Sequence, residues 1–496
     1  MAAAEGAPVG GAHGGRRGLR GAAAALGALL FLGCAGAATL PGAPGLETVE
    51  IVEAEIVAAP SRLPLLDGGE LEVWAYNGQV PGPTLRVRRG QTLRVRFENR
   101  LPQPTTIHWH GVRVPNAMDG VPWVTQDPVP PGGTFVYEFA PPDAGTYWFH
   151  PHLRSSEQVE RGLYGILVVE EDEPPPGVRE ILWVLDDWRL GEDGQVEPRF
   201  NTRTDLAHDG RWGDVLTVNG RLRPAEPVRA GERLRLRLVN VANGRVFAPD
   251  FGAWEPRLVA FDGLPTDRPL DAAGLELAPG NRADLDLLVP RVSGGTRLEV
   301  TDRFTSRVRV LATLAVEGAV PEEGPASPAL RLGPWPAELP PDRAEPRHTF
   351  RLASREGGPF GIEWTIGGAA YRHEDHAPGG HGDHPVLATL PLGQWARLRF
   401  WNDSFRLHPM HIHGLFFRVV ARDGRPVAEE RWRDTVLLRP RETVDVAALP
   451  LDPGLWMMHC HILEHAEAGM MSLLEVAAPD VGLSANPDRA GGGKEK

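Results

Sequence analysis

The sequence predicts an all-β protein made of three β-sandwich domains. One strand motif occurs three times, beginning at Gly90, Gly231 and Gly393, with spacings of 141 and 162 residues. These spacings fit domains of ordinary size in a chain of 496 residues. Gly (58) and Pro (48) are abundant, which favours short strands joined by turns over long helices.

Each copy of the motif is predicted to be a half-buried strand. It starts at the turn glycine, continues with alternating residues that place arginines on one face, and ends at Asn99, Asn240 or Asn402. Alternation alone is the general signature of a half-buried strand. Three copies in near register indicate a repeated domain instead.

Proline-rich segments separate the three copies. Pro174, Pro175 and Pro176 follow the first copy, and 321–346 follows the second. The sequence therefore predicts domains at 46–173, 177–320 and 345–478. The polar, glycine-rich end at 479–496 is predicted to be a disordered tail.

The first residues are typical of a secretory signal. Arg16, Arg17 and Arg20 precede an apolar stretch at 22–32, and the small residues at 35–37 suit cleavage after position 37. We therefore expect a signal peptide at 1–37 and an exported protein that is periplasmic, attached to the cell surface or secreted. Twin-arginine export and a lipid anchor at Cys34 are the alternatives. No later segment is apolar enough to span a membrane.

Charge and cysteine content exclude several classes of protein. The chain has 65 acidic and 52 basic residues, a net charge of −13, which argues against a nucleic-acid surface. It has 17 His but only 2 Cys, so a structural zinc site built from several cysteines is excluded. After signal cleavage only Cys460 remains. A monomer is expected.

Histidines occur in pairs separated by one residue. Alternate residues of a strand point to the same face, so each pair presents two imidazoles side by side. Imidazole is a ligand of copper, zinc, iron and nickel. The first and third domains each carry two pairs and the middle domain carries none, and eight neutral imidazoles suit three metal ions better than one. The pairs are His108/His110, His150/His152, His411/His413 and His459/His461.

A second kind of metal site is predicted around Cys460. It lies between the histidines of the fourth pair, so its side chain points to the opposite strand face, where His408 and His465 could meet it. Met470 follows ten residues later. Two histidines, a thiolate and a weak axial methionine are typical of a blue-copper electron-transfer site. Pro151 occupies the corresponding position of the first domain, so only one such site is expected.

These four segments resemble the signature of the multicopper oxidases, specifically the bacterial laccase-like group with three Greek-key, cupredoxin-like domains. The resemblance covers about 47–477 and implies one type 1, one type 2 and two type 3 copper ions. It also implies that a small substrate is oxidised one electron at a time at type 1, and that the trinuclear cluster reduces O2 to water. The implied ligands are His408, Cys460, His465 and axial Met470 for type 1; His108 and His411 for type 2; and His110, His150, His152, His413, His459 and His461 for type 3.

Nearby acids could supply the protons that O2 reduction consumes. By resemblance Asp119 is a proton-relay or water-orienting acid, although an aspartate before glycine is also a common turn residue. Many bacterial relatives carry a second acid directly after the last type 1 histidine. Here that residue is Ala466, and Glu464 and Glu467 are its acidic neighbours. Asp434 is expected to have a structural role, with substrate contact as the weaker alternative.

The resemblance leaves the substrate open. Phenols and aromatic amines are one class, and the reduced metal ions Cu(I), Fe(II) and Mn(II) are the other. The segment 373–384 holds four histidines and three acids, so it is either a solvated loop or a port for metal ions. The chain has no methionine-rich segment, which counts against a dedicated cuprous oxidase.

A protein that binds or stores copper without catalytic turnover is the alternative from another functional class. Copper storage does not need a blue-copper site, which argues against this alternative.

Three tryptophans adjoin predicted ligands and are expected to be structural packing residues: Trp109, Trp148 and Trp456.

Overall fold

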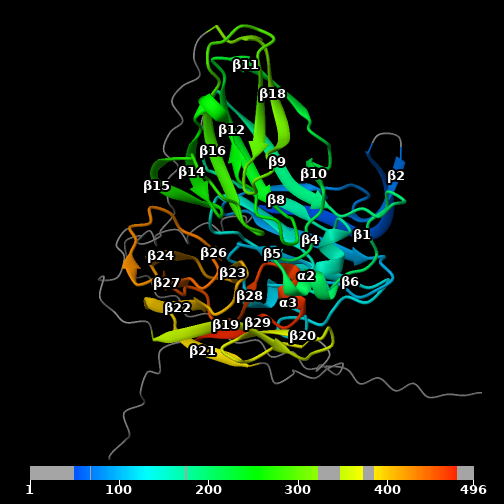
Figure 1. The fold of residues 1–496 in the computed structure, drawn as a ribbon, viewed down its shortest axis with the longest axis vertical. Helices are drawn as coiled ribbons and strands as arrows, with labels where there is room; N and C mark the ends of the chain where they lie inside the picture. Colours follow the sequence, from blue (N-terminus) through cyan, green and yellow to red (C-terminus); the bar gives the residue numbers. More distant parts are fainter. Residues whose placement is uncertain (1–49, 67–68, 174–175, 322–346, 373–384, 478–496) are drawn as a thin grey trace, which may run out of the picture. The chain divides into compact units, whose positions relative to one another are not determined.

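The computed structural model describes residues 50–66, 69–173, 176–321, 347–372 and 385–477. Strands dominate this part of the chain, which confirms the all-β prediction (Figure 1). Its α-helices are short: α1 (Ser155–Glu160), α2 (Arg203–Ala207) and α3 (Leu463–Glu467). The predicted signal peptide, Cys34, the tail and the segment 373–384 lie outside the described residues.

The first two sheets are built from the N-terminal strands. Their orders are β2-β1-β4-β6 and β3-β8-β7-β5. The strands are β1 (Ile51–Leu66), β2 (Gly69–Tyr76), β3 (Thr84–Arg88), β4 (Thr92–Asn99), β5 (His108–His110), β6 (Thr134–Phe139), β7 (Gly145–His150) and β8 (Gly165–Glu170).

The next two sheets use only strands from the middle of the chain. Their orders are β10-β9-β12-β16-β14-β15 and β11-β18-β17-β13. The strands are β9 (Val178–Trp188), β10 (Val215–Val218), β11 (Ala225–Ala230), β12 (Arg233–Asn240), β13 (Pro249–Asp250), β14 (Arg257–Phe261), β15 (Leu264–Asp271), β16 (Arg282–Leu288), β17 (Arg297–Asp302) and β18 (Arg309–Ala319).

The last two sheets follow in the same way, with orders β20-β19-β22-β27-β24-β25 and β21-β29-β28-β23-β26. The strands are β19 (His348–Glu356), β20 (Ile362–Ile366), β21 (Val386–Pro391), β22 (Ala396–Asn402), β23 (His408–Ile412), β24 (Phe417–Arg422), β25 (Arg425–Pro426), β26 (Thr435–Leu438), β27 (Thr443–Ala448), β28 (Gly454–Cys460) and β29 (Met471–Ala477).

The strand pairing repeats three times, as the sequence motif predicts. The motif strands β4, β12 and β22 each pair in parallel with the first strand of their own segment, which is β1, β9 or β19. Each motif strand also pairs antiparallel with a later strand, β6, β16 or β27. Apolar side chains from both sheets of a pair share one core, so each pair is a β-sandwich. The exact domain boundaries stay a prediction.

The asparagine that ends each motif strand has the same structural role in all three copies. Its side-chain oxygen accepts a hydrogen bond from the backbone N–H two residues later, at 2.9, 3.0 and 3.0 Å for Asn99, Asn240 and Asn402. Its amide donates to two backbone carbonyls at 2.7–3.0 Å. These bonds fix the loop that follows the strand. In the first and third segments this loop leads directly to a histidine cluster.

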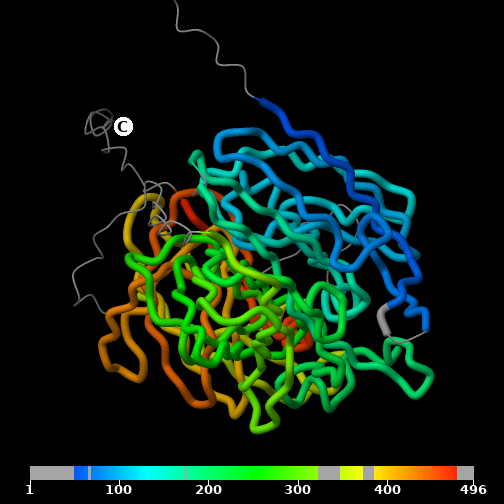
Figure 2. Tube along the Cα trace, turned by 90° about the horizontal axis from the view of Figure 1, so that it is seen from above, coloured from blue at the N-terminus to red at the C-terminus, as the bar shows by residue number. Residues whose placement is uncertain are grey.

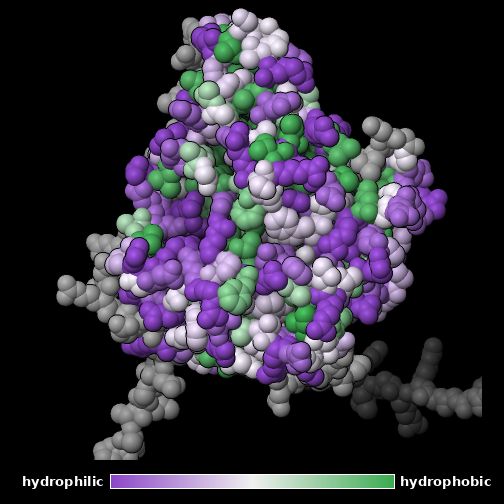
Figure 3. All heavy atoms as spheres, viewed as in Figure 1, coloured by the Kyte–Doolittle hydropathy of each residue, from purple (hydrophilic) through white to green (hydrophobic). Residues whose placement is uncertain are grey.

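The first and third segments lie beside each other in the tube view (Figure 2), where they are blue to cyan and yellow to red. A hydrogen bond between Asp119 and His413 connects them. Figure 3 shows polar and apolar residues mixed over the face in view. No helix within the described ranges has the length and apolar character needed to cross a membrane.

Candidate metal centre

The predicted histidine pairs lie on neighbouring strands and just beyond their ends. β5 holds both His108 and His110, whereas β7, β23 and β28 each hold the first histidine of a pair and end before the second, which is His152, His413 or His461. In the first segment β5 lies antiparallel to β7, with His108 opposite His150. In the third segment β23 lies antiparallel to β28, with His411 opposite His459. Cross-strand partners are close in space, so each outer segment brings its two pairs together. All eight of these imidazoles are at most 2% exposed.

The eight imidazoles form two triads and one pair. In one triad, ring nitrogens of His110, His150 and His461 lie within 4.8 Å of one another. The second triad is His152, His413 and His459, under the same limit. His108 and His411 form the remaining pair, with His110 as their neighbour. Each triad and the pair draw on both outer segments, so the predicted shared surface is present.

The hydrogen bonding of these rings tests whether a metal fits. The Nδ1 atoms of His108, His150 and His411 face backbone carbonyl oxygens at 2.8, 2.9 and 2.9 Å. A carbonyl only accepts, so each Nδ1 carries the proton and each Nε2 offers a lone pair. Those three Nε2 atoms are buried without a hydrogen-bond partner. A carbonyl that fixes the tautomer in this way is typical of a metal-ligating histidine.

His461 supports the same conclusion more strongly. It is fully buried, and neither of its ring nitrogens has a hydrogen-bond partner. A buried polar group without a partner costs about 1–3 kcal/mol. A metal ion held by this triad would remove that cost for the coordinating nitrogen, so the residues present fit a metal ion with imidazole ligands.

Burial also sets the charge of these rings. It lowers the pKa of most of them below its ordinary value, and the neighbouring imidazoles lower it further. They are therefore neutral near pH 7, as metal ligands must be. The rings with a lowered pKa are His110, His150, His411, His413, His459 and His461.

The predicted type 1 residues also come together. Cys460 Sγ lies 3.5 Å from Nδ1 of His408 and 3.7 Å from Nδ1 of His465. The opposite nitrogens are held by protein groups: His408 Nε2 contacts Ser404 Oγ at 2.9 Å, and His465 Nε2 donates to the backbone oxygen of His208 at 2.7 Å. Burial raises the pKa of the Cys460 thiol and lowers that of His465 to about 3. Because their Nε2 atoms are held by other groups, His408 and His465 both direct the Nδ1 lone pair toward Cys460 Sγ.

Met470 lies next to this group. Its side chain is fully buried in the same apolar core as Cys460, and its backbone oxygen accepts a hydrogen bond from the Cys460 N–H at 3.0 Å. This places the residue beside Cys460. Its axial role stays a prediction.

Trp364 is a neighbour of this site that sequence reasoning missed. Its ring lies 4.4 Å from the ring of His465 and 4.9 Å from that of His408, measured between centroids. Its Nε1 donates to the backbone oxygen of Leu206 in α2 at 2.9 Å. No motif marks this residue, because its position depends on packing between β20 and α2.

Asp119 contacts two of the predicted ligands. Its carboxylate accepts from Nδ1 of His413 at 2.8 Å and lies 3.2 Å from Nδ1 of His108. The side chain is 1% exposed. It also ends a 3-10 turn before Gly120, so the turn interpretation holds as well. A role in proton transfer stays a prediction.

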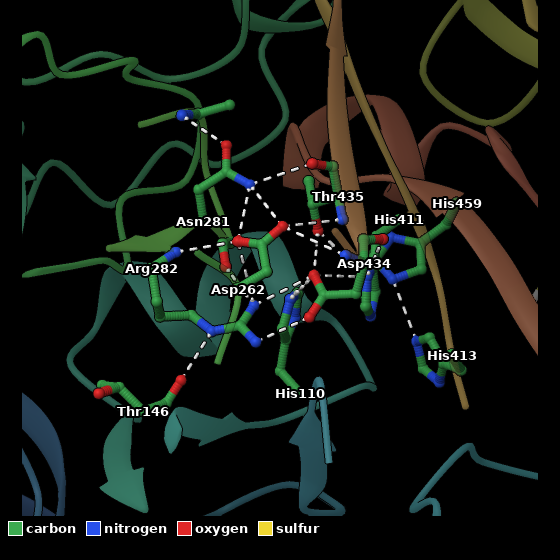
Figure 4. A network of polar contacts seen from close by, with 12 residues as sticks. His110, Thr146, Asp262, Asn281, Arg282, His411, His413, Asp434, Thr435 and His459 are labelled. Carbon is green, nitrogen blue, oxygen red and sulfur yellow. Dashed lines mark hydrogen bonds and ion pairs between the residues drawn. The ribbon is translucent and has the colours of Figure 1, made fainter. Parts of the chain in front are cut away.

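Of the other candidate acids, Asp434 lies beside predicted copper ligands and Glu464 does not. Asp434 is 1% exposed, which fits the expected structural role and not the weaker alternative of a substrate contact. It pairs with Arg282 beside His110 and His411 (Figure 4). Glu464 is buried too, but its oxygens accept from Asn243 Nδ2 at 2.8 Å and from the Arg211 N–H at 3.1 Å, not from an imidazole.

The three tryptophans next to predicted ligands are structural packing residues, as expected. Trp148 stacks on His150 with 4.2 Å between ring centroids. Trp109 packs among aromatic rings of the first core, and Trp456 donates to the backbone oxygen of Asp452. All three are fully buried.

Comparisons with known proteins agree with this geometry. Two family models described as multicopper oxidase match residues 59–174 and 364–480. The chain is 30% identical to the multicopper oxidase MmcO of Mycobacterium tuberculosis, over 86% of this chain and 87% of that protein. It is 29% identical to the bilirubin oxidase of Albifimbria verrucaria, over 84% and 75%.

Solved structures agree as well. The multicopper oxidase of Pseudomonas thermotolerans superposes with a TM-score of 0.76 at 37% identity, covering 87% of this chain and all of that one. A Campylobacter jejuni multicopper oxidase, described as a metallo-oxidase, gives 0.71 at 25% identity, covering 87% and 93%. With this similarity along most of its length, and with its histidines and its cysteine gathered as described, the chain belongs to the multicopper oxidase family, whose members are copper-dependent oxidases.

Proposed function

We propose that the chain is an exported, laccase-type oxidase that takes single electrons from a small substrate at a type 1 copper and reduces O2 to water at a trinuclear copper cluster. The position of Cys460 carries this proposal. Its thiol faces His408 and His465, while the residues on either side of it belong to two different imidazole triads. One tripeptide therefore joins the electron-accepting site to the site of O2 reduction.

The proposed ligands follow the observed groups. His408, Cys460 and His465 would hold type 1 copper together with Met470, and His108 and His411 would hold type 2. The two triads would each hold one type 3 copper: His110, His150 and His461, and His152, His413 and His459. Bound copper would supply one-electron redox chemistry and the stored electrons that O2 reduction needs.

The chain's own residues would control water and protons at these sites. Trp364, Ser404 and the backbone of His208 cover the type 1 histidines, which keeps bulk water away from them. Asp119 is the proposed proton-handling acid, because its buried carboxylate lies against His108 and His413. The predicted signal at 1–37 supports export, and we propose a monomer.

Phenols and aromatic amines are the proposed substrates, and O2 uptake tests this. The copper-loaded protein should consume O2 with these donors at about four one-electron equivalents per O2 and release no hydrogen peroxide. The screen should also include Cu(I), Fe(II) and Mn(II). A blue, copper-replete protein that consumes no O2 with any donor would contradict the oxidase proposal and favour copper binding without turnover.

A metallo-oxidase is the second candidate. The similarity to the Campylobacter jejuni metallo-oxidase and the histidine-rich segment 373–384 favour it. Deleting 373–384 should then slow metal-ion oxidation by about tenfold or more, since an entry site would be lost, and should change phenol oxidation less than about twofold. Both rates are measured by O2 uptake.

The control for this deletion keeps the length of the segment. A variant with His373, His376, His381 and His384 replaced by asparagine should show the same selective loss if imidazoles bind the incoming ion. Equal losses with metal ions and phenols in either variant would contradict a metal port.

A further inference from the structure

The middle segment supplies no histidine pair, yet its side chains reach the predicted cluster (Figure 4). Asp262 lies between β14 and β15, Asn281 precedes β16, and Arg282 begins it. All three are at most 2% exposed. They meet Asp434 and Thr435 at the start of β26 in the third segment.

Arg282 forms a bidentate ion pair with Asp434. Its Nη2 donates to Asp434 Oδ2 at 2.7 Å and its Nη1 donates to Oδ1 at 3.1 Å. It also donates to the backbone oxygens of Gly280 at 3.0 Å and Thr146 at 3.2 Å, and its Nη1 lies 3.6 Å from Asp262 Oδ1. The guanidinium is therefore fixed by all three segments and has no freedom to turn.

The Asp434 carboxylate, held by Arg282, contacts two predicted copper ligands. Its Oδ1 lies 3.3 Å from His110 Nε2 and 3.4 Å from His411 Nδ1, and its backbone oxygen accepts from His411 Nδ1 at 2.9 Å. Thr435 Oγ1 donates to the same Oδ1 at 2.8 Å. A displaced Asp434 carboxylate would leave both imidazoles without this contact.

Asp262 holds the backbone on the far side of the network. Its Oδ2 accepts from the N–H groups of Asp434 and Thr435, both at 3.2 Å, and its Oδ1 accepts from the Arg282 N–H at 3.1 Å. Asn281 Nδ2 donates to the same carboxylate at 3.0 Å. The start of β26 is therefore tied to the middle segment through main chain as well as side chains.

Glycine makes room for this arrangement. A Cβ on Gly111 would lie 2.2 Å from Arg282 Nη2 and 2.5 Å from Asp434 Oδ2. A Cβ on Gly280 would lie 2.9 Å from ring atoms of His110 and His461. The ion pair therefore packs directly against the backbone of the first ligand loop, with no space for another arrangement.

We propose that Arg282 is a positioning residue for the type 2 side of the cluster: it fixes the Asp434 carboxylate, which in turn orients His411 and His110. This rests on the ligand assignment in the proposed function. Partners that orient metal ligands typically contribute 10–100-fold to metal affinity. A lysine at position 282 would keep the positive charge but could not form the bidentate contact with the Asp434 carboxylate. The middle segment would thus have a direct part in copper binding without supplying a ligand.

The test compares Arg282→Lys and Arg282→Gln in the full copper-loaded chain. Dialysis against a chelator should remove type 2 copper about 10–100-fold faster from Arg282→Gln than from the unmodified protein, with Arg282→Lys in between. The electron paramagnetic resonance spectrum of type 2 copper should change, while the blue absorption of type 1 should not. Arg235→Lys is the matched control, because Arg235 is a buried arginine on the adjacent strand β12 that pairs with Glu171.

Several results would overturn the proposal. One is unchanged copper retention and an unchanged type 2 spectrum in both Arg282 variants. Another is a parallel loss of the blue band, because that indicates general destabilisation. A double-mutant cycle of Arg282→Lys with Asp434→Asn must also show effects that do not add, because Arg282 acts through Asp434. A lack of blue colour in the unmodified protein would contradict the proposed function instead.

Discussion

Replacing Cys460 with serine is expected to abolish the blue absorption at about 600 nm and to reduce substrate oxidation to the background rate. That absorption arises from a thiolate bound to Cu(II), and a serine hydroxyl cannot replace the thiolate. The thiol is the point on which Nδ1 of His408 and Nδ1 of His465 converge, at 3.5 and 3.7 Å. Without it, electrons from the substrate have no site at which to enter.

The rest of the copper should survive this substitution. The eight imidazoles of the cluster do not include the thiol, so copper content should fall by about one ion, and the type 2 resonance should remain. Met458→Leu is the matched control, because Met458 is a fully buried, uncharged residue of the same strand, and leucine has a similar volume. A serine variant that stays blue would contradict the type 1 assignment. Loss of all copper would show that the two sites do not bind independently.

The repeated strands and the histidine pairs could be predicted because their geometry is local. A strand places alternate side chains on one face, so the pair at 108 and 110 presents two imidazoles in any strand. The three motif asparagines end equivalent strands because each binds the backbone within five residues of itself. Such short-range relations are directly visible in a sequence.

The residues around the ligands could not be predicted, because their contacts are long-range. Arg282 is an ordinary first residue of a strand in the sequence, and 152 positions separate it from Asp434. Trp364 reaches His465 only when β20 packs beside α3 and α2. The sequence does not show which residues Asp434 contacts, since nothing local identifies Arg282, His110 or His411 as its neighbours.

His150→Gln is expected to separate the two halves of the reaction. His150 comes from the first segment, far along the chain from Cys460, and its unpartnered Nε2 faces His110 and His461. Glutamine is of similar size but is a poor substitute for an imidazole ligand. The variant should stay blue, and substrate should bleach it without O2 as fast as it bleaches the unmodified protein. Readmitted O2 should then fail to restore the colour.

Stopped-flow absorbance measures both half-reactions on one sample. His348→Gln is the matched control, because His348 lies on β19 outside every ligand group and should be reoxidised at the normal rate. Reoxidation of His150→Gln at the unmodified rate would contradict the triad of His110, His150 and His461. Slow bleaching would show that substrate electrons depend on the cluster as well as on the type 1 site. Cys460 ends β28, and its two histidine neighbours belong to different triads, so a ligand from the other segment separates electron entry from O2 reduction without changing this tripeptide.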